Sequence, residues 1–240
     1  MMSLAKTDIE KDTLRRLLHY VDDETLTGTS AWTCFSSPRA EHVYDEDEPP
    51  ITFTTDERNS LKSLKKRVVE RLERRNRRAC AYCKRPVGNY GYGWNIEHVY
   101  PKASFPASTF SLQNLTIGCV DCNQWKAARV DKKTLAEGLT IIEPVANGFR
   151  YGDHINLVHI ATEDICFIKY RPTSKAGKQT YEKLQFTDIE RSTIIDSVND
   201  DLAALHRRMN DLLASAQSGD SHTELVALLG QLKSNIYRLG

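Results

Sequence analysis

Two cysteine pairs frame the stretch that decides the fold, residues 80–126, which reads CAYCKRPVGNYGYGWNIEHVYPKASFPASTFSLQNLTIGCVDCNQWK. Cys80 and Cys83 open this stretch, and Cys119 and Cys122 lie near its end. Four thiolates in two Cys-x-x-Cys pairs satisfy a tetrahedral zinc ion and leave no open position, which is typical of a structural site. We therefore predict a structural Zn²⁺ bound by all four cysteines, with thiol redox chemistry as the alternative.

The spacer between the two pairs carries polar residues that a zinc site alone does not need. Its 35 residues include Glu97, His98, Lys102 and Asn114, and Asn123 directly follows the last cysteine. A plain zinc ribbon usually has a shorter spacer. The same stretch is therefore a candidate for chemistry as well as for metal binding.

Length and charge limit the class of protein. A chain of 240 residues can bury a core in one domain or in two small ones. With 33 basic and 32 acidic residues the chain is no polycation, but its charge is unevenly placed. Residues 62–85 contain eleven basic residues against two acids, and residues 41–48 contain five acids and no Lys or Arg. Such local asymmetry says more about binding partners than the net charge does.

The remaining cysteines and the N-terminus predict a cytoplasmic protein. Cys34 and Cys166 stand apart without partner spacing, and we expect them to be small buried residues. The first residues have no apolar signal region, and no run approaches the length of a membrane span. We predict no membrane contact.

Helical periodicity appears twice before the cysteines. Residues 8–20 place apolar side chains at helical spacing, residues 21–55 read as an irregular arm, and Thr54 with Glu57 forms a capping-box signal for a second helix. The polar face of that second helix is basic. It is either a solvated face or a surface for phosphates, and its cations are Lys62, Lys65, Lys66, Arg67, Arg71, Arg74 and Arg75.

The chain after the first cysteine pair predicts a mixed α+β fold. We expect a strand over 94–99, a helix over 120–130, and a hairpin from strands 155–161 and 165–170. Capping-box spacings at Thr187…Glu190 and Ser221…Glu224 predict an antiparallel helix pair at the end. The predicted regions are therefore 1–55 (helix and arm), 56–136 (basic helix and zinc core) and 137–240 (hairpin and helix pair).

Three polar residues of the stretch suit the cleavage of a phosphodiester. The reaction needs a general base for water and a cation beside the phosphate, and a histidine can supply the first. Carboxylate and amide oxygens are the ligands that Mg²⁺ or Mn²⁺ prefers. Glu97, His98 and Asn123 provide one of each, and closure of both cysteine pairs on one zinc would bring them together. The alternatives are an exposed strand carboxylate, a structural histidine and a helix-capping asparagine.

These residues resemble the HNH endonucleases, whose fold is a treble-clef-like ββα-metal unit with a structural four-cysteine zinc. The resemblance rests on the Cys80/Cys83 pair, Glu97-His98, Asn114-Leu115 and Cys119-x-x-Cys122-Asn123-x-x-Lys126. It implies that His98 activates water and that Asn123 binds a catalytic Mg²⁺ or Mn²⁺. Glu97 stands where the family more often has Asp as a metal ligand, and Asn114 would order the loop through backbone hydrogen bonds.

A narrower branch of that family is similar in two further segments, residues 96–102 and 172–180. That branch occurs beside ATPases in bacterial anti-phage systems of the Septu and retron type. The resemblance implies an effector of antiviral defence with an ABC- or SMC-like ATPase as its partner subunit.

The leading prediction is a metal-dependent DNA endonuclease, with RNA open as a substrate. The alternative is a non-catalytic zinc module that binds nucleic acid or protein, and a third reading is an effector subunit restrained within a larger assembly. The sequence leaves open whether His154 and His159 lie in the core, on the surface or near the site. The predicted nucleic-acid contacts, of which the last two could also be ordinary surface lysines, are Lys65, Lys66, Arg71, Arg74, Arg75, Lys102 and Lys126.

Overall fold

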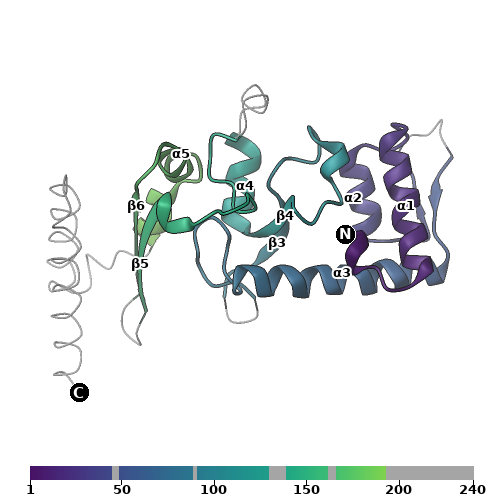
Figure 1. The fold of residues 1–240 in the computed structure, drawn as a ribbon, viewed down its shortest axis with the longest axis horizontal. Helices are drawn as coiled ribbons and strands as arrows, with labels where there is room; N and C mark the ends of the chain where they lie inside the picture. Colours follow the sequence, from purple (N-terminus) through teal and green to yellow (C-terminus); the bar gives the residue numbers. More distant parts are fainter. Residues whose placement is uncertain (45–48, 89–90, 130–138, 162–165, 193–240) are drawn as a thin grey trace, which may run out of the picture. The chain divides into compact units, whose positions relative to one another are not determined.

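The computed structural model describes residues 1–44, 49–88, 91–129, 139–161 and 166–192 (Figure 1). Helices and strands occur together in these residues, which confirms the mixed class predicted from the sequence. The chain divides into two compact units, Met1–Ile155 with Pro172–Phe186, and Asn156–Arg171 with Thr187–Gly240. The boundaries expected at residues 55 and 136 stay predictions.

The N-terminal helices confirm one prediction and correct another. After a 3-10 turn η1 (Met2–Leu4), helix α1 (Asp8–Asp22) begins with a capping box between Thr7 and Glu10. The following residues are not an irregular arm, because helix α2 (Gly28–Ser36) forms there behind the N-cap Thr27. Helix α2 has only nine residues, so it shows too few turns for a clear apolar period.

Two short strands and the long helix α3 complete this part of the chain. Strand β1 (Glu41–His42) pairs antiparallel with β2 (Ile51–Thr52). Helix α3 (Thr55–Asn76) begins with the predicted Thr54–Glu57 capping box. Helix α3 lies against α1 and α2 (Figure 1), and its buried residues are Leu61, Leu64, Val68 and Leu72.

A hairpin and a helix follow α3. Strand β3 (Trp94–His98) pairs antiparallel with β4 (Leu115–Cys119), and helix α4 (Val120–Arg129) continues directly from β4. The loop between the strands contains the 3-10 turn η2 (Pro106–Ser108). The end of α3 is fixed to this hairpin by the hydrogen bond between Thr116 Oγ1 and Asn76 Oδ1, which are 3.1 Å apart. The predicted strand and helix are both present.

The remaining elements include one helix that the sequence did not suggest. Strands β5 (Ile155–Ala161) and β6 (Cys166–Pro172) pair as predicted, and helix α5 (Lys175–Lys183) follows behind the N-cap Ser174. A 3-10 turn η4 spans Tyr151–Asp153. Helix α6 (Phe186–Ser192) begins before Thr187, so the N-cap predicted at Thr187 is wrong.

Some predictions cannot be compared with this structure. The C-terminal helix pair falls almost wholly on residues 193–240, outside the described residues. None of the helices in the described part of the chain has the length and apolar character that a membrane crossing needs.

Gly28, the first residue of α2, should not tolerate replacement by a residue with a side chain. A Cβ on Gly28 would collide with the Lys102 carbonyl oxygen and lie 2.7 Å from Thr109 Oγ1. We therefore expect Gly28→Ala to lower the free energy of unfolding by about 2 kcal/mol, because α2 must move away from the loop that it contacts.

Urea unfolding of the zinc-loaded protein measures this change. Gly152→Ala is the matched control, since a Cβ there meets no atom within 4 Å, and we expect a change within about 0.5 kcal/mol. Equal stability of the two variants would show that α2 does not depend on this close approach.

Candidate active site and metal centre

Two turns bring the four cysteines together. Cys80 and Cys83 lie in a tight turn closed by the Lys84 amide, which donates to the Cys80 carbonyl oxygen at 3.1 Å. Cys119 ends β4, and Cys122 lies in the first turn of α4. All four side chains are buried, and their sulfur atoms lie within 4.8 Å of one another.

The cluster fits a tetrahedral zinc ion. Zn–S bonds of about 2.3 Å place the sulfur atoms about 3.8 Å apart, and the Cys83 and Cys119 sulfur atoms are 3.7 Å apart. Burial raises the pKa of the Cys80 thiol well above its usual value. Four ionised thiols in one buried cluster therefore require a cation, and the donor set is the one that zinc prefers.

Arg85 supplies further positive charge to this cluster, a role that the sequence analysis missed. Its guanidinium donates to the sulfur atoms of Cys83 and Cys119, each at 3.4 Å, and to Asp121 at 2.5 Å. The neighbouring thiols and Asp121 raise its pKa against the effect of burial. Its position next to a cysteine pair was the only signal in the sequence.

His98 is buried at the end of β3, and its surroundings define its protonation. Nε2 lies 3.0 Å from the Thr109 carbonyl oxygen, and the Trp32 ring packs edge-on with the ring centroids 4.4 Å apart. Because a carbonyl oxygen only accepts, Nε2 carries the proton and Nδ1 has the lone pair. Burial, and then the charges of Lys102 and Lys126, lower the pKa of His98 to about 4. The imidazole is therefore neutral at pH 7.

Glu97 forms a buried ion pair with Lys126. The Lys126 ammonium lies 2.6 Å from Glu97 Oε1 and donates to the His98 carbonyl oxygen at 2.7 Å. Burial raises the pKa of Glu97, and the charge of Lys126 opposes this rise. Lys126 is only 3% exposed, so it is not at the surface. The alternative of an ordinary surface lysine is therefore wrong for Lys126, and its phosphate contact stays a prediction.

Asn123 and Glu97 approach each other across Gly118. A Cβ on Gly118 would lie 3.2 Å from the Glu97 Cβ and 3.7 Å from the Asn123 Cβ, so the absence of a side chain leaves room between them. The Tyr82 hydroxyl is buried without a hydrogen-bond partner among the described residues, close enough to Glu97 for the carboxylate to raise its pKa.

The residues around Gly118 suit a hard divalent ion. A carboxylate and an amide oxygen are ligands for Mg²⁺ or Mn²⁺, and Lys126 at Oε1 leaves the carboxylate further acceptor sites. The group therefore fits Glu97 and Asn123 as its protein ligands.

Asn114 organises the loop that follows His98. Its Oδ1 accepts from the Tyr100 amide at 2.8 Å, and its Nδ2 donates to the carbonyl oxygens of Tyr100 at 3.0 Å and Ser108 at 3.2 Å. The side chain is buried and all its partners are backbone groups. Asn114 therefore acts on the shape of the loop and does not touch the other site residues through these bonds.

The basic residues of α3 lie in different surroundings. Lys66, Arg71 and Arg74 are exposed, which suits contact with a ligand. Arg75 donates instead to the carbonyl oxygens of Leu112 and Leu115, and Lys65 donates to the Ser36 carbonyl oxygen at 2.7 Å. Part of the basic face thus fixes helix α3 to its neighbours.

The structure also gives the surroundings of Cys34, His154 and His159, which lie outside the motif. Cys34 is buried next to the Tyr44 hydroxyl at 3.3 Å, as a small buried residue should be. His154 stacks on Phe149 and hydrogen-bonds to Ser174 at 2.9 Å, and His159 is exposed. The surroundings of the Cys166 side chain lie outside the description.

Removal of zinc should unfold the site. We expect one zinc ion per chain, lost together with the tertiary structure when a strong chelator is added, because the buried thiolates need the ion. Inductively coupled plasma mass spectrometry and near-UV circular dichroism measure the two effects. Cys83→Ser should lose the zinc, and Cys34→Ser is the matched control that should keep it; zinc retained by both would contradict this assignment.

Removal of only one partner of the Glu97–Lys126 pair should lower the free energy of unfolding. We expect Lys126→Met to lower the free energy of unfolding by about 3 kcal/mol, because Glu97 would be left buried and unpaired. Glu97→Gln in the same chain should recover part of the loss, since no buried charge then remains.

Urea unfolding at constant zinc concentration tests this coupling. Lys11→Met is the control, because the Lys11–Asp8 pair is exposed and should contribute less than about 1 kcal/mol. Strictly additive effects of the two changes at Glu97 and Lys126 would show that the pair is not coupled.

Comparison with known proteins identifies the segment that contains these groups. Residues 80–129 match a family model described as HNH endonuclease. A search of curated proteins and a search of solved structures each returned no match. The matched segment includes the four cysteines, Glu97, His98, Asn114 and Asn123, and the match confirms the family resemblance inferred from the sequence. Within this chain, residues 80–129 are therefore the segment that is similar to the HNH endonuclease family.

Proposed function

We propose that this protein is a metal-dependent endonuclease that hydrolyses phosphodiester bonds in DNA. The observation that carries the proposal is His98, buried and held in one tautomer by the Thr109 carbonyl oxygen, directly after Glu97, which shares the space at Gly118 with Asn123. A binding module has no need for these three groups together. The order of β3, β4 and α4 around the cysteines supports a ββα-metal arrangement.

His98 is proposed as the general base. Its Nε2–H is fixed on the Thr109 carbonyl oxygen, so the ring is oriented with Nδ1 as the proton acceptor. The low pKa keeps the ring neutral but makes it a weak base. A phosphate bound near it would oppose the charges of Lys102 and Lys126 and raise that pKa toward neutrality.

Glu97 and Asn123 are proposed to hold Mg²⁺ or Mn²⁺. When bound, the ion supplies charge neutralisation at the scissile phosphate and at the departing oxygen. Lys126 keeps Glu97 ionised in its buried position and thereby maintains a ligand. Asn114 keeps the loop after His98 in place.

The runner-up is a non-catalytic zinc module that binds nucleic acid or protein. One observation favours it: His98 is covered by Trp32 and is only 4% exposed, while Glu97 is already paired with Lys126. A catalytic site must admit both substrate and metal to these groups. Cleavage assays therefore separate the two functions.

We also propose a role as an effector in anti-phage defence, with an ABC- or SMC-like ATPase as partner. This proposal rests on the similarity of residues 96–102 and 172–180 to that branch of the family. Co-purification of the chain with an ATPase encoded beside it tests the assignment, and a chain that purifies alone and cuts without a trigger would count against it.

Removal of the proposed base should abolish cleavage. We expect His98→Ala to reduce plasmid cleavage with Mg²⁺ or Mn²⁺ by at least about 100-fold, because general-base catalysis contributes that much or more. The variant must retain zinc and its unfolding temperature. His19→Ala is the control, since His19 is exposed on α1 and should leave cleavage unchanged.

The pH dependence gives a second readout for the same residue. Because the folded pKa of His98 is below 6.5, the base is present at pH 6 and is lost only as the pH falls toward about 4. The acid limb of kcat/KM for the wild type should therefore lie below pH 6. Cutting by His98→Ala at the wild-type rate would exclude this base, whereas DNA binding without cutting by either protein would favour the binding module.

A further inference from the structure

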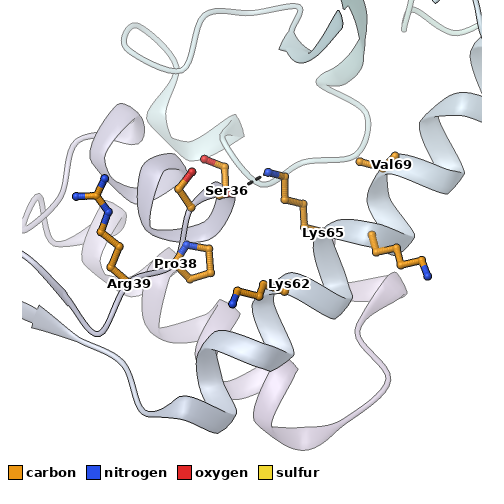
Figure 2. A pocket seen from close by; sticks show the side chains of 8 residues that line it. Ser36, Pro38, Arg39, Lys62, Lys65 and Val69 are labelled. Carbon is orange, nitrogen blue, oxygen red and sulfur yellow. Dashed lines mark hydrogen bonds between the residues drawn. The ribbon is translucent and has the colours of Figure 1, made fainter. Parts of the chain in front are cut away.

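A basic hollow lies outside the proposed active site, between the end of α2 and the middle of α3 (Figure 2). It has a volume of about 620 Å³. One wall is the segment from Ser36 to Arg39, and the other is the face of α3 that presents Lys62, Lys65 and Lys66. The sequence already placed Lys62, Lys65 and Lys66 on a possible surface for phosphates, so Arg39 and the serines are additions.

Within the described residues, no acidic group compensates the charge in this hollow. Four cations line it, and none of its lining residues is acidic. No carboxylate of the described residues forms an ion pair with any of the four, whereas Arg67 on the same helix is paired with Glu10. Converging like charges repel each other unless an anion binds between them. The hollow therefore selects an anionic ligand.

The donors suit phosphate in particular. The Lys65 ammonium donates to the Ser36 carbonyl oxygen at 2.7 Å, which fixes its position, and an ammonium has two further donors. Figure 2 shows Lys62 on α3 and Arg39 on the other segment, with Pro38 between them. A guanidinium presents a planar fork that matches phosphate oxygens, and lysines act as point charges beside it.

The size of the hollow exceeds that of a bare ion. A volume of about 620 Å³ is in the range of pockets that hold small organic ligands. Pro38 and Val69 add apolar surface to the basic lining. A phosphate together with its sugar therefore fits the hollow better than an isolated ion does.

Helix α2 connects this hollow with the proposed base. The Trp32 ring packs on His98, and Ser36 follows one helical turn later, about 6 Å along the axis. Trp32 and Ser36 thus face the same side of α2. A strand bound in the hollow would have to pass Trp32, which covers His98, to reach the proposed base.

We propose that this hollow is a phosphate-binding subsite that holds a backbone phosphate of the nucleic-acid strand away from the scissile bond. The proposal rests on the proposed nuclease function and adds a second point of attachment for its substrate. Arg39, Lys62, Lys65 and Lys66 are the residues that bind this phosphate.

Binding without cleavage tests the subsite. In a His98→Ala background, we compare the dissociation constants of a fluorescein-labelled 20-nucleotide single strand and the matching duplex by fluorescence anisotropy. Arg39→Gln/Lys62→Gln should weaken binding about 10-fold and reduce the slope of log K against log salt by about 1, because phosphate contacts are lost. Lys65 is left intact, since it also fixes α3 to Ser36.

The matched control removes the same charge elsewhere. Lys11→Gln/Arg15→Gln neutralises two exposed cations of α1 that are paired with Asp8 and Asp12, and it should bind like the parent. Both variants must keep one zinc and the parental unfolding temperature. Equal weakening in both would show a general charge effect, and no weakening in the first would show that the hollow is not used; either result overturns the subsite.

A second set of measurements distinguishes free phosphate from a nucleic-acid phosphate as the ligand of the hollow. It also distinguishes failure of the subsite from failure of the nuclease proposal. If inorganic phosphate stabilises the parent but not Arg39→Gln/Lys62→Gln, while oligonucleotide affinities are equal, the hollow serves free phosphate and the nucleic-acid assignment is overturned. If the wild type cuts no DNA but oligonucleotide binding still depends on Arg39 and Lys62, the nuclease proposal fails and the subsite stands.

Discussion

Four buried sulfur atoms hold together two segments that are far apart in the sequence. Cys80 and Cys83 follow α3, Cys119 ends β4, and Cys122 lies in the first turn of α4, so one ion at this point would fix the helix, the hairpin and the second helix at once. The β3–β4 hairpin and α4 would have little apolar area of their own to hold them in register. The positions of Glu97 and Asn123 therefore depend on the cluster.

Among the described residues of this domain, each buried charge is paired with a group of opposite charge. This pairing explains the positions of two buried cations near the site, Arg85 and Lys126. Arg85 compensates the thiolates, and Lys126 compensates Glu97. Each cation also touches a second group, Asp121 or the His98 carbonyl oxygen, which satisfies further donors. A buried carboxylate without such a partner would take up a proton and lose its value as a metal ligand.

Local signals in the sequence were sufficient for much of the fold and for the family. Apolar spacing over residues 8–20 predicted α1, the capping box at Thr54 predicted the start of α3, and a strand was predicted over 94–99, where β3 lies. The two cysteine pairs, with Glu97 and His98 between them, identified the HNH resemblance that the family match confirms. The capping box, each cysteine pair and the Glu97-His98 dipeptide each span only a few residues of the sequence.

Long-range packing could not be predicted in the same way. The burial of Lys126 depends on Glu97, 29 residues earlier, and the contact of Trp32 with His98 joins residues 66 positions apart. The first was expected at the surface because lysine is usually exposed. The contact of Trp32 with His98 was not predicted because α2 is short. The role of Trp32 follows only from the three-dimensional contact.

The contact between Trp32 and His98 connects protection of the proposed base with substrate binding. Trp32 helps bury the imidazole, and burial is the largest cause of its low pKa. A base held neutral in this way is ready at pH 7 but is weak until an anion approaches. If a strand enters along α2 from the basic hollow, the phosphate that brings the substrate to His98 also raises the basicity of His98. The covered position of the base is then compatible with catalysis, because the substrate itself supplies the charge that the free site lacks.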